Sequence, residues 1–147
     1  MTVIAFDGKT LAADRMSGSQ YIKSPASIKA HRIRGCLVGL AGEAAMNAEW
    51  RAWFAAGAKP EDFPSTFRDS DKCSTALVIT ESGEINVYQA TPYPIVIVGP
   101  THAIGSGAEA AMAVMALGHD ARKAVEIASV VCAGCGNGID TIELERL

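Results

Sequence analysis

Most of the hydrophobic pattern along the chain predicts short β-strands. Residues 3–6 and 10–13 are apolar runs separated by Asp7-Gly8-Lys9, and an Asp-Gly pair in that place is a good signal of a β-hairpin. The almost continuous apolar run at residues 36–41 is typical of a strand that is buried on both faces. Further strands are predicted from the runs at residues 27–33, 75–80, 84–89, 93–98 and 139–144.

Three stretches have helical spacing instead. Residues 43–56 predict the first helix, with Gly57 as its stop. One stripe of this helix is hydrophobic: Met46, Trp50, Trp53 and Phe54. The stripe favours packing against a core, and a subunit interface is the alternative, because tryptophans are frequent interface anchors. Residues 108–117 predict an alanine-rich helix, and beyond Gly118 a further helix begins with Asp120 as a suitable N-cap.

The order of these elements predicts the fold class. Strands are followed by a helix, more strands, a pair of helices and a final strand, and hairpins dominate. We therefore expect an α+β fold built in layers around largely antiparallel sheets, and not a doubly wound parallel sheet. With 147 residues, the chain is expected to form one domain, residues 1–147.

Composition narrows the class of function. Hydrophobic residues make up 49% of the chain and charged residues 20%, which is typical of a globular protein. The net charge of -3 and the scattered Lys and Arg argue against a nucleic-acid partner. No apolar run approaches the roughly 20 residues that span a bilayer, so we expect no membrane association. Four cysteines without a disulfide-framework spacing fit a soluble, cytoplasmic protein.

The N-terminus offers a candidate nucleophile. Thr2 opens the first predicted strand, and methionine aminopeptidases generally remove Met1 when the second residue is as small as threonine. Thr2 would then carry both a hydroxyl and a free α-amine, so a nucleophile and a base would share one residue. The alternative is that Thr2 only starts a strand, as β-branched residues often do.

Several further motifs follow Thr2 in a fixed order. They are Leu11-Ala12-Ala13-Asp14, Ile28-Lys29, Gly39-Leu40-Ala41-Gly42, Ile104-Gly105-Ser106-Gly107 and Asp140-Thr141-Ile142-Glu143. This order resembles the proteasome β-type family over essentially the whole chain. It is most similar to the bacterial HslV branch and to the short HslV-like proteins of phages and prophages. The resemblance implies an N-terminal nucleophile hydrolase with a four-layer αββα sandwich.

The resemblance also implies catalytic roles for five residues. Thr2 matches the nucleophile, Asp14 the acidic residue that ends the second strand, and Lys29 the lysine that pairs with it. Ser106 matches the serine near the nucleophile's amine, and Gly42 the glycine whose N–H faces the developing oxyanion. A nearby ammonium disfavours protonation of the amine, so losing the lysine or its carboxylate should affect rate more than fold. Taken singly, Asp14 also fits a turn former at a strand end and Lys29 a solvated strand residue. Gly42 also fits the entry to a helix, and Ser106 a helix N-cap.

The implied activity is that of a threonine-type endopeptidase acting on peptides or unfolded proteins. Family members form rings with inward-facing sites, so the resemblance implies a homo-oligomeric ring and leaves open an ATP-dependent unfoldase as partner. No cofactor is required, although relatives of the HslV type can bind a monovalent cation through backbone carbonyls of the C-terminal loop. A catalytically inactive, ring-forming scaffold of the same fold is the alternative.

Three features depart from the family or point elsewhere. Val3 stands where many relatives have a second threonine, and the segment at residues 132–138, Cys-Ala-Gly-Cys-Gly-Asn-Gly, is divergent. Its two cysteines could indicate a redox or metal site, but no second Cys pair or suitably spaced His accompanies them. The glycine-rich stretch at residues 105–110 also resembles a dinucleotide fingerprint, yet the region about 20 residues further on reads as helix and not as a strand end.

Overall fold

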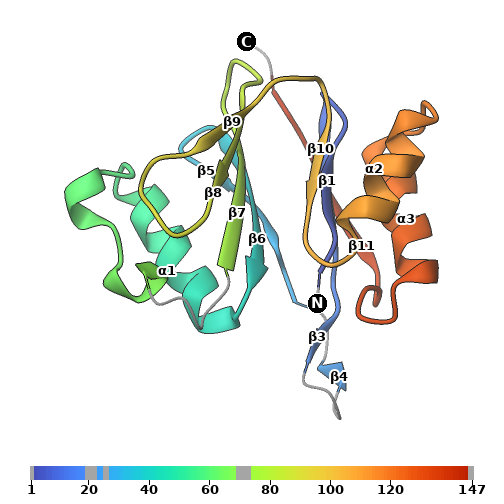
Figure 1. Cartoon of the computed structure of the whole chain (residues 1–147), viewed down its shortest axis with the longest axis horizontal. Helices are drawn as coiled ribbons and strands as arrows, with labels where there is room; N and C mark the ends of the chain where they lie inside the picture. Colours follow the sequence, from blue (N-terminus) through green and yellow to red (C-terminus); the bar gives the residue numbers. More distant parts are fainter. Residues whose placement is uncertain (1, 19–22, 25–26, 69–73, 146–147) are drawn as a thin grey trace.

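Two antiparallel β-sheets face each other, and helices cover their outer sides (Figure 1). The computed structural model describes residues 2–18, 23–24, 27–68 and 74–145. Three α-helices and two main sheets lie in this part of the chain, so the predicted α+β class with antiparallel sheets is confirmed. None of the helices in the described ranges is long and apolar enough to cross a membrane.

The first sheet has four strands in the order β10-β1-β2-β11. Its strands are β1 (Ile4–Phe6), β2 (Thr10–Asp14), β10 (His102–Ile104) and β11 (Ile139–Glu143). The predicted first hairpin is confirmed, because β1 pairs with β2 around a turn in which the Asp7 carboxylate accepts hydrogen bonds from the backbone N–H groups of Lys9 and Thr10. The last strand of the chain, β11, pairs with β2, so residues 139–143 lie beside the start of the sequence.

The second sheet has five strands in sequence order. They are β5 (Ala30–Ile33), β6 (Cys36–Gly42), β7 (Ser74–Ile79), β8 (Ile85–Tyr88) and β9 (Ile95–Ile97). The buried strand near residues 36–41 and the second hairpin are therefore confirmed. A further short pair, β3 (Ser17–Gly18) and β4 (Lys23–Ser24), extends from the end of β2. The hydrophobic pattern did not predict β10 as a strand of its own, separate from β9 and in the other sheet.

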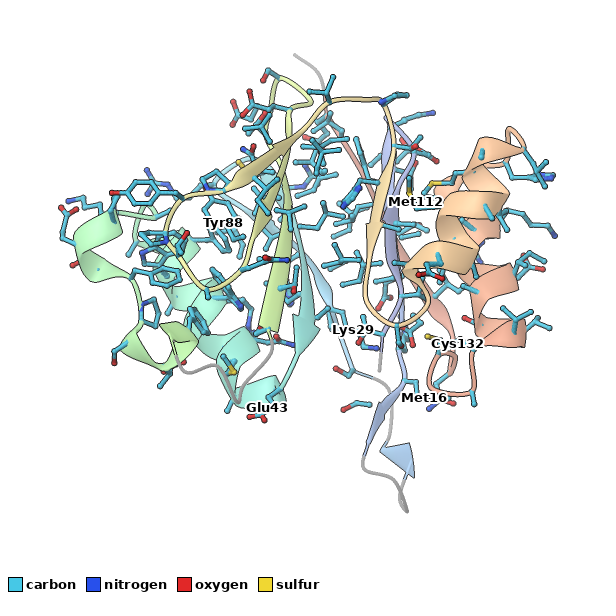
Figure 2. The ribbon with its side chains drawn as sticks, in the orientation of Figure 1. Met16, Lys29, Glu43, Tyr88, Met112 and Cys132 are labelled. Atoms are coloured by element: carbon cyan, nitrogen blue, oxygen red, sulfur yellow. The ribbon has the colours of Figure 1, made fainter. Side chains whose placement is uncertain are left out.

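Helix α1 (Ala44–Ala55) covers the five-stranded sheet, and its four stripe residues are all buried. Two 3-10 turns, η1 (Pro60–Asp62) and η2 (Ser65–Arg68), bring two phenylalanines against Trp50, with 4.1 Å between the ring centroids of Trp50 and Phe67. In this structure the aromatic stripe is core, as the first of the two interpretations predicted. Figure 2 shows Tyr88, from β8, in the same aromatic cluster.

Helices α2 (Ala108–Ala116) and α3 (Ala121–Val131) cover the four-stranded sheet as a pair. The predicted N-cap is confirmed, because the Asp120 side chain accepts a hydrogen bond of 2.8 Å from the Lys123 N–H. Residues 3–6, which end in β1, alternate between the two sides of the sheet: Val3 and Ala5 face these helices, while Ile4 and Phe6 face the other sheet.

The two sheets approach each other closely at Gly39. A Cβ atom at this position of β6 would lie 2.5 Å from Cγ2 of Ile4, on β1. Real Cβ atoms essentially never come so close, so the glycine lets β6 pack directly against β1. Strand β1, in the middle of its own sheet, therefore packs directly on the other sheet, and residues of both sheets can meet at its start.

Candidate active site

A buried ion pair joins the two sheets beside the start of β1. Lys29 Nζ lies 2.8 Å from Asp14 Oδ1, and the two side chains are only 5% and 0% exposed. Asp14 ends β2, whereas Lys29 directly precedes β5 and accepts a hydrogen bond at its carbonyl from the Leu40 N–H. The lysine therefore extends from the five-stranded sheet to a carboxylate of the other sheet, and it lies between them in Figure 2.

The Asp14 carboxylate is fully engaged by the surrounding chain. Oδ1 accepts hydrogen bonds from Lys29 Nζ and from the Val3 N–H at 3.0 Å. Oδ2 accepts from the N–H groups of Gly136 at 3.0 Å and Met16 at 3.3 Å. A carboxylate has about four acceptor positions, and burying one is costly unless they are satisfied. Asp14 Oδ1 thus holds the ammonium of Lys29 beside the backbone N–H of Val3, the residue that follows Thr2.

The nitrogen of Thr2 lies against Ser106. The Thr2 N–H donates to Ser106 Oγ at 3.1 Å, and the Ser106 hydroxyl donates to the Thr2 carbonyl at 3.3 Å. The same carbonyl accepts a hydrogen bond of 3.1 Å from the Gly107 N–H. Both ends of the Thr2 backbone are therefore held by the turn at residues 105–107, in the loop that joins β10 to α2.

The two glycines of this turn are explained by its contact with the N-terminus. Gly105 has a positive φ of 95°, and a Cβ there would lie 2.2 Å from the Thr2 carbonyl oxygen. A Cβ at Gly107 would lie 2.8 Å from Cβ of Val3. The chain itself fills the space that a pyrophosphate would need, and β10 runs antiparallel to its neighbour β1. The structure therefore does not support the dinucleotide interpretation of this motif.

Gly42 is the last residue of β6, where it pairs with Ser74 and has a φ of 139°. The described contacts connect Thr2, Asp14, Lys29 and Ser106 into one group, and they do not connect Gly42 to it directly. Gly42 lies three residues beyond Gly39, the point where β6 crosses Ile4. Its neighbours Leu40 and Ala41 are only 1% and 8% exposed and pack into the two cores on either side of β6. Both side chains are therefore occupied in core packing.

The divergent C-terminal loop also reaches this group, which sequence reasoning missed. The thiols of Cys132 and Cys135 lie 3.2 Å apart, and their sulfurs are 3.7 Å and 3.8 Å from Ser106 Oγ. The hydrogen bond from Cys135 lowers the pKa of the Cys132 thiol, whereas burial raises the pKa of Cys135 to about 12. Pairing of β11 with β2 places Ile139 opposite Asp14, so the end of this loop must lie at the site.

Arg15 fastens the loop to the residue that follows Asp14. Its backbone N–H donates to the carbonyls of Gly136 and Gly138, at 2.9 Å and 3.1 Å. Its guanidinium forms an ion pair with Asp140 at the start of β11. The pairing of β11 with β2 is the signal that could have revealed these contacts between Arg15 and the loop. Together with the Gly136 bond to Asp14, these contacts hold the loop in a defined position.

Within the described ranges, no group of three or more His, Cys, Asp or Glu residues is arranged to hold a metal ion. The carbonyls of Gly136 and Gly138, which belong to the loop where relatives can bind a monovalent cation, are bonded to the Arg15 N–H. A cation in this loop stays a prediction. Cys73 lies outside the described residues.

The fold is that of HslV-like proteins, as comparison with solved structures shows. No protein-family model and no curated protein matches the sequence. Among solved structures, BPH of Thiobacillus denitrificans is similar at a TM-score of 0.72 and 18% identity, over 99% of each chain. BPH in complex with epoxomicin gives a TM-score of 0.74 at 17% identity, over 99% of this chain and 100% of that one. Eukaryotic HslV of Trypanosoma brucei gives 0.70 at 24% identity, over 99% of each.

Proposed function

We propose that this protein is a threonine-type endopeptidase whose nucleophile is Thr2, exposed by removal of Met1. The observation that carries the proposal is the position of the Thr2 nitrogen. It lies 3.1 Å from Ser106 Oγ, and the next residue of the chain is bonded to the buried Asp14–Lys29 pair. Likeness of fold to HslV supports a peptidase but says nothing about which residues react.

The α-amine of Thr2 would act as the general base. While Met1 is attached, the Thr2 nitrogen is a peptide N–H; once Met1 is removed, the same atom is an amine. A free α-amine has an unperturbed pKa of about 7.7 to 8.0, which is close to the working range of a general base. If the amine continues to donate one hydrogen to Ser106 Oγ, its lone pair remains available for the proton of the Thr2 hydroxyl. Ser106 would therefore orient the base.

Lys29 and Asp14 would set the charge of the site. A buried ammonium beside residues 2 and 3 disfavours a second positive charge on the amine and stabilises negative charge that develops as Thr2 attacks. Asp14 would keep Lys29 charged and oriented through the contacts described above. An apolar pair of similar volume often stabilises a fold as much as a buried ion pair, or more. Stability alone therefore does not explain the Asp14–Lys29 pair, whereas a role in catalysis would.

The reaction would proceed through an ester on Thr2. The hydroxyl oxygen attacks the substrate carbonyl as the α-amine takes its proton, and the tetrahedral intermediate carries the negative charge on the former carbonyl oxygen. The Gly42 N–H is the proposed donor to that oxygen, a contribution of about 2.7 to 4 kcal/mol for such donors. The amine then returns the proton to the leaving nitrogen, and water hydrolyses the ester.

Assembly and fold type complete the proposal. We infer that the helix and sheet layers are the four-layer αββα sandwich of the N-terminal nucleophile hydrolases, formed by residues 1–147 as one domain. A homo-oligomeric ring in the cytoplasm, acting on peptides or unfolded proteins, fits the resemblance to HslV. BPH, which is similar to this chain in fold, has been solved in complex with epoxomicin.

Substitution of Thr2 tests the nucleophile. Thr2→Ala should abolish hydrolysis of a fluorogenic peptide, while Thr2→Ser should retain part of it, because serine keeps both the hydroxyl and the α-amine. Alanine and serine are both small enough at position 2 for Met1 to be removed, so both variants should lose Met1 as the wild type does. Intact mass checks this removal. Hydrolysis by the purified Thr2→Ala protein at the wild-type rate would overturn the proposal.

A further inference from the structure

The two thiols of the C-terminal loop are placed to react with each other. Cys132 Sγ and Cys135 Sγ are 3.2 Å apart, and neither is in a disulfide. A disulfide bond is about 2.05 Å long, so bonding requires an approach of about 1.1 Å. The backbone between them is already turned, since the Cys135 N–H donates to the Cys132 carbonyl at 3.1 Å. Only a small local movement separates this pair from a disulfide.

The two thiols differ in exposure and in pKa, which gives them different roles in thiol–disulfide exchange. Cys132 is partly exposed, whereas Cys135 is 3% exposed. The Cys135 thiol donates its hydrogen to Cys132, which favours the thiolate of Cys132 and lowers its pKa. Cys132 is therefore the thiol that meets an external reagent, and Cys135 is the one that resolves the product.

Both sulfurs also contact Ser106, the residue that holds the Thr2 nitrogen. Ser106 has one hydroxyl hydrogen, which is donated to the Thr2 carbonyl, and its oxygen accepts from the Thr2 N–H. In that arrangement the Cys132 S–H, 3.7 Å away, is the donor to Ser106 Oγ, because the Cys135 hydrogen is donated to Cys132, and Cys135 Sγ packs against the same oxygen at 3.8 Å. A disulfide has no S–H group. Oxidation would therefore remove the Cys132 hydrogen-bond donor from Ser106 and move the two sulfurs that pack against it.

We propose that Cys132 and Cys135 form a redox modification site: a small-molecule disulfide such as oxidised glutathione converts them to a disulfide, which displaces Ser106 and slows acylation of Thr2. The effect on acylation rests on the proposed function, whereas the disulfide itself does not. A metal site is the other use of a cysteine pair, but it would need ligands beyond two thiols, and the described part of the chain supplies no such group.

The oxidation proceeds in two exchanges. The Cys132 thiolate attacks one sulfur of oxidised glutathione, which forms a mixed disulfide and releases one glutathione thiolate. Cys135 gives its proton to that thiolate, attacks the Cys132 sulfur and displaces the second glutathione, which is protonated by solvent. Two protein thiols are oxidised, and one glutathione disulfide is reduced to two thiols.

The test uses the full chain in buffers of defined ratios of oxidised to reduced glutathione. Non-reducing peptide mapping measures the disulfide, and the rate of adduct formation with a peptide epoxyketone measures the reactivity of Thr2. We expect a Cys132–Cys135 disulfide that dithiothreitol reverses, together with adduct formation slowed about tenfold, equivalent to about 1.4 kcal/mol. Cys132→Ser should give neither response. Cys36→Ser is the matched control, because Cys36 packs on the α1 side of β6 and should leave both responses intact.

Each outcome decides one part of the proposal. Absence of the disulfide at every ratio would overturn the site, and a disulfide with an unchanged adduct rate would overturn its effect on Ser106. If the reduced protein gives no adduct, the proposed peptidase function fails, while the peptide map still decides whether the site exists. Hydrogen exchange then decides the effect on Ser106: oxidation should speed exchange of the Gly107 amide, which is bonded to the Thr2 carbonyl, and unchanged exchange would overturn it.

Discussion

At the scale of single residues, Asp14 organises the candidate site more than any other side chain described. It accepts hydrogen bonds from the backbone of Val3 just before β1, from the ammonium of Lys29 and from Gly136 in the C-terminal loop. These three segments are distant in sequence, and one carboxylate joins them. Sequence reasoning expected this pair to affect rate more than fold. Its complete burial leads to a different expectation, that loss of Lys29 affects both.

Replacing Lys29 with methionine should abolish peptide hydrolysis and also lower the free energy of unfolding by about 3 to 5 kcal/mol, because the Asp14 carboxylate remains buried without its partner. Urea denaturation measures the second effect. Lys9→Met is the control: Lys9 pairs with Glu143 at the surface, where both side chains are mostly exposed, and its loss should change stability by less than about 1 kcal/mol. Wild-type stability of Lys29→Met would show that the buried pair contributes nothing to the fold.

The cysteine pair gives a prediction about pH. Alkylation by iodoacetamide follows the thiolate, and the pKa of Cys132 is lowered while that of Cys135 is raised to about 12. As pH rises from 6, Cys132 should therefore be modified first, and Cys135 should stay unmodified through pH 9. Cys135→Ala removes the hydrogen-bond donor, so the alkylation profile of Cys132 should move to higher pH. Mass mapping of alkylated peptides measures both, and equal modification of the two thiols would refute the assignment.

At the scale of elements, the turn between β10 and α2 matters most, because it holds Thr2. Its glycines are explained by distances that no sequence pattern contains, namely the approach of residues 105 and 107 to the backbone of residues 2 and 3. Family order identified Ser106, but only the structure shows that the turn excludes a nucleotide.

Gly105→Ala tests this contact. The new Cβ would meet the Thr2 carbonyl at 2.2 Å at a positive φ, so the turn must move away from Thr2. We expect a loss of stability of about 1 to 3 kcal/mol, together with loss of epoxyketone reactivity. Gly118→Ala is a matched control, since its φ of 94° is similar but nothing lies within 4 Å of the new Cβ. It should cost about 1 kcal/mol and retain reactivity; the same loss of reactivity in both variants would contradict the proposed contact.

Elements with strong local signals were predictable, and those fixed by distant contacts were not. The Asp-Gly hairpin, the buried run of β6, the α1 stripe and the Asp120 cap are all encoded within a few neighbouring residues, and they were predicted. Strand β10 is only three residues long and joins a sheet started about 100 residues earlier, so local pattern could not separate it from β9. The loop at residues 132–138 is defined by contacts with Asp14, Arg15 and Ser106, which spacing alone does not reveal.

At the scale of the whole molecule, the candidate site exists only when the two sheets are packed together. Lys29 comes from one sheet and Asp14 from the other, while Thr2 starts the strand that Gly39 allows to lie against β6. The turn at Ser106 and the C-terminal loop enclose the same point from the side of α2 and α3. Thr2 is only 6% exposed and thus lies buried where these segments meet.

Intact mass before and after incubation with a peptide epoxyketone tests the central claim most directly, because the reagent closes a ring with both the hydroxyl and the α-amine of an N-terminal threonine. We expect a protein that has lost Met1 and gains one adduct per chain, located at Thr2 and absent in Thr2→Ala. A protein that has lost Met1 and still gives no adduct would contradict the claim, and would leave the fold as that of an inactive scaffold.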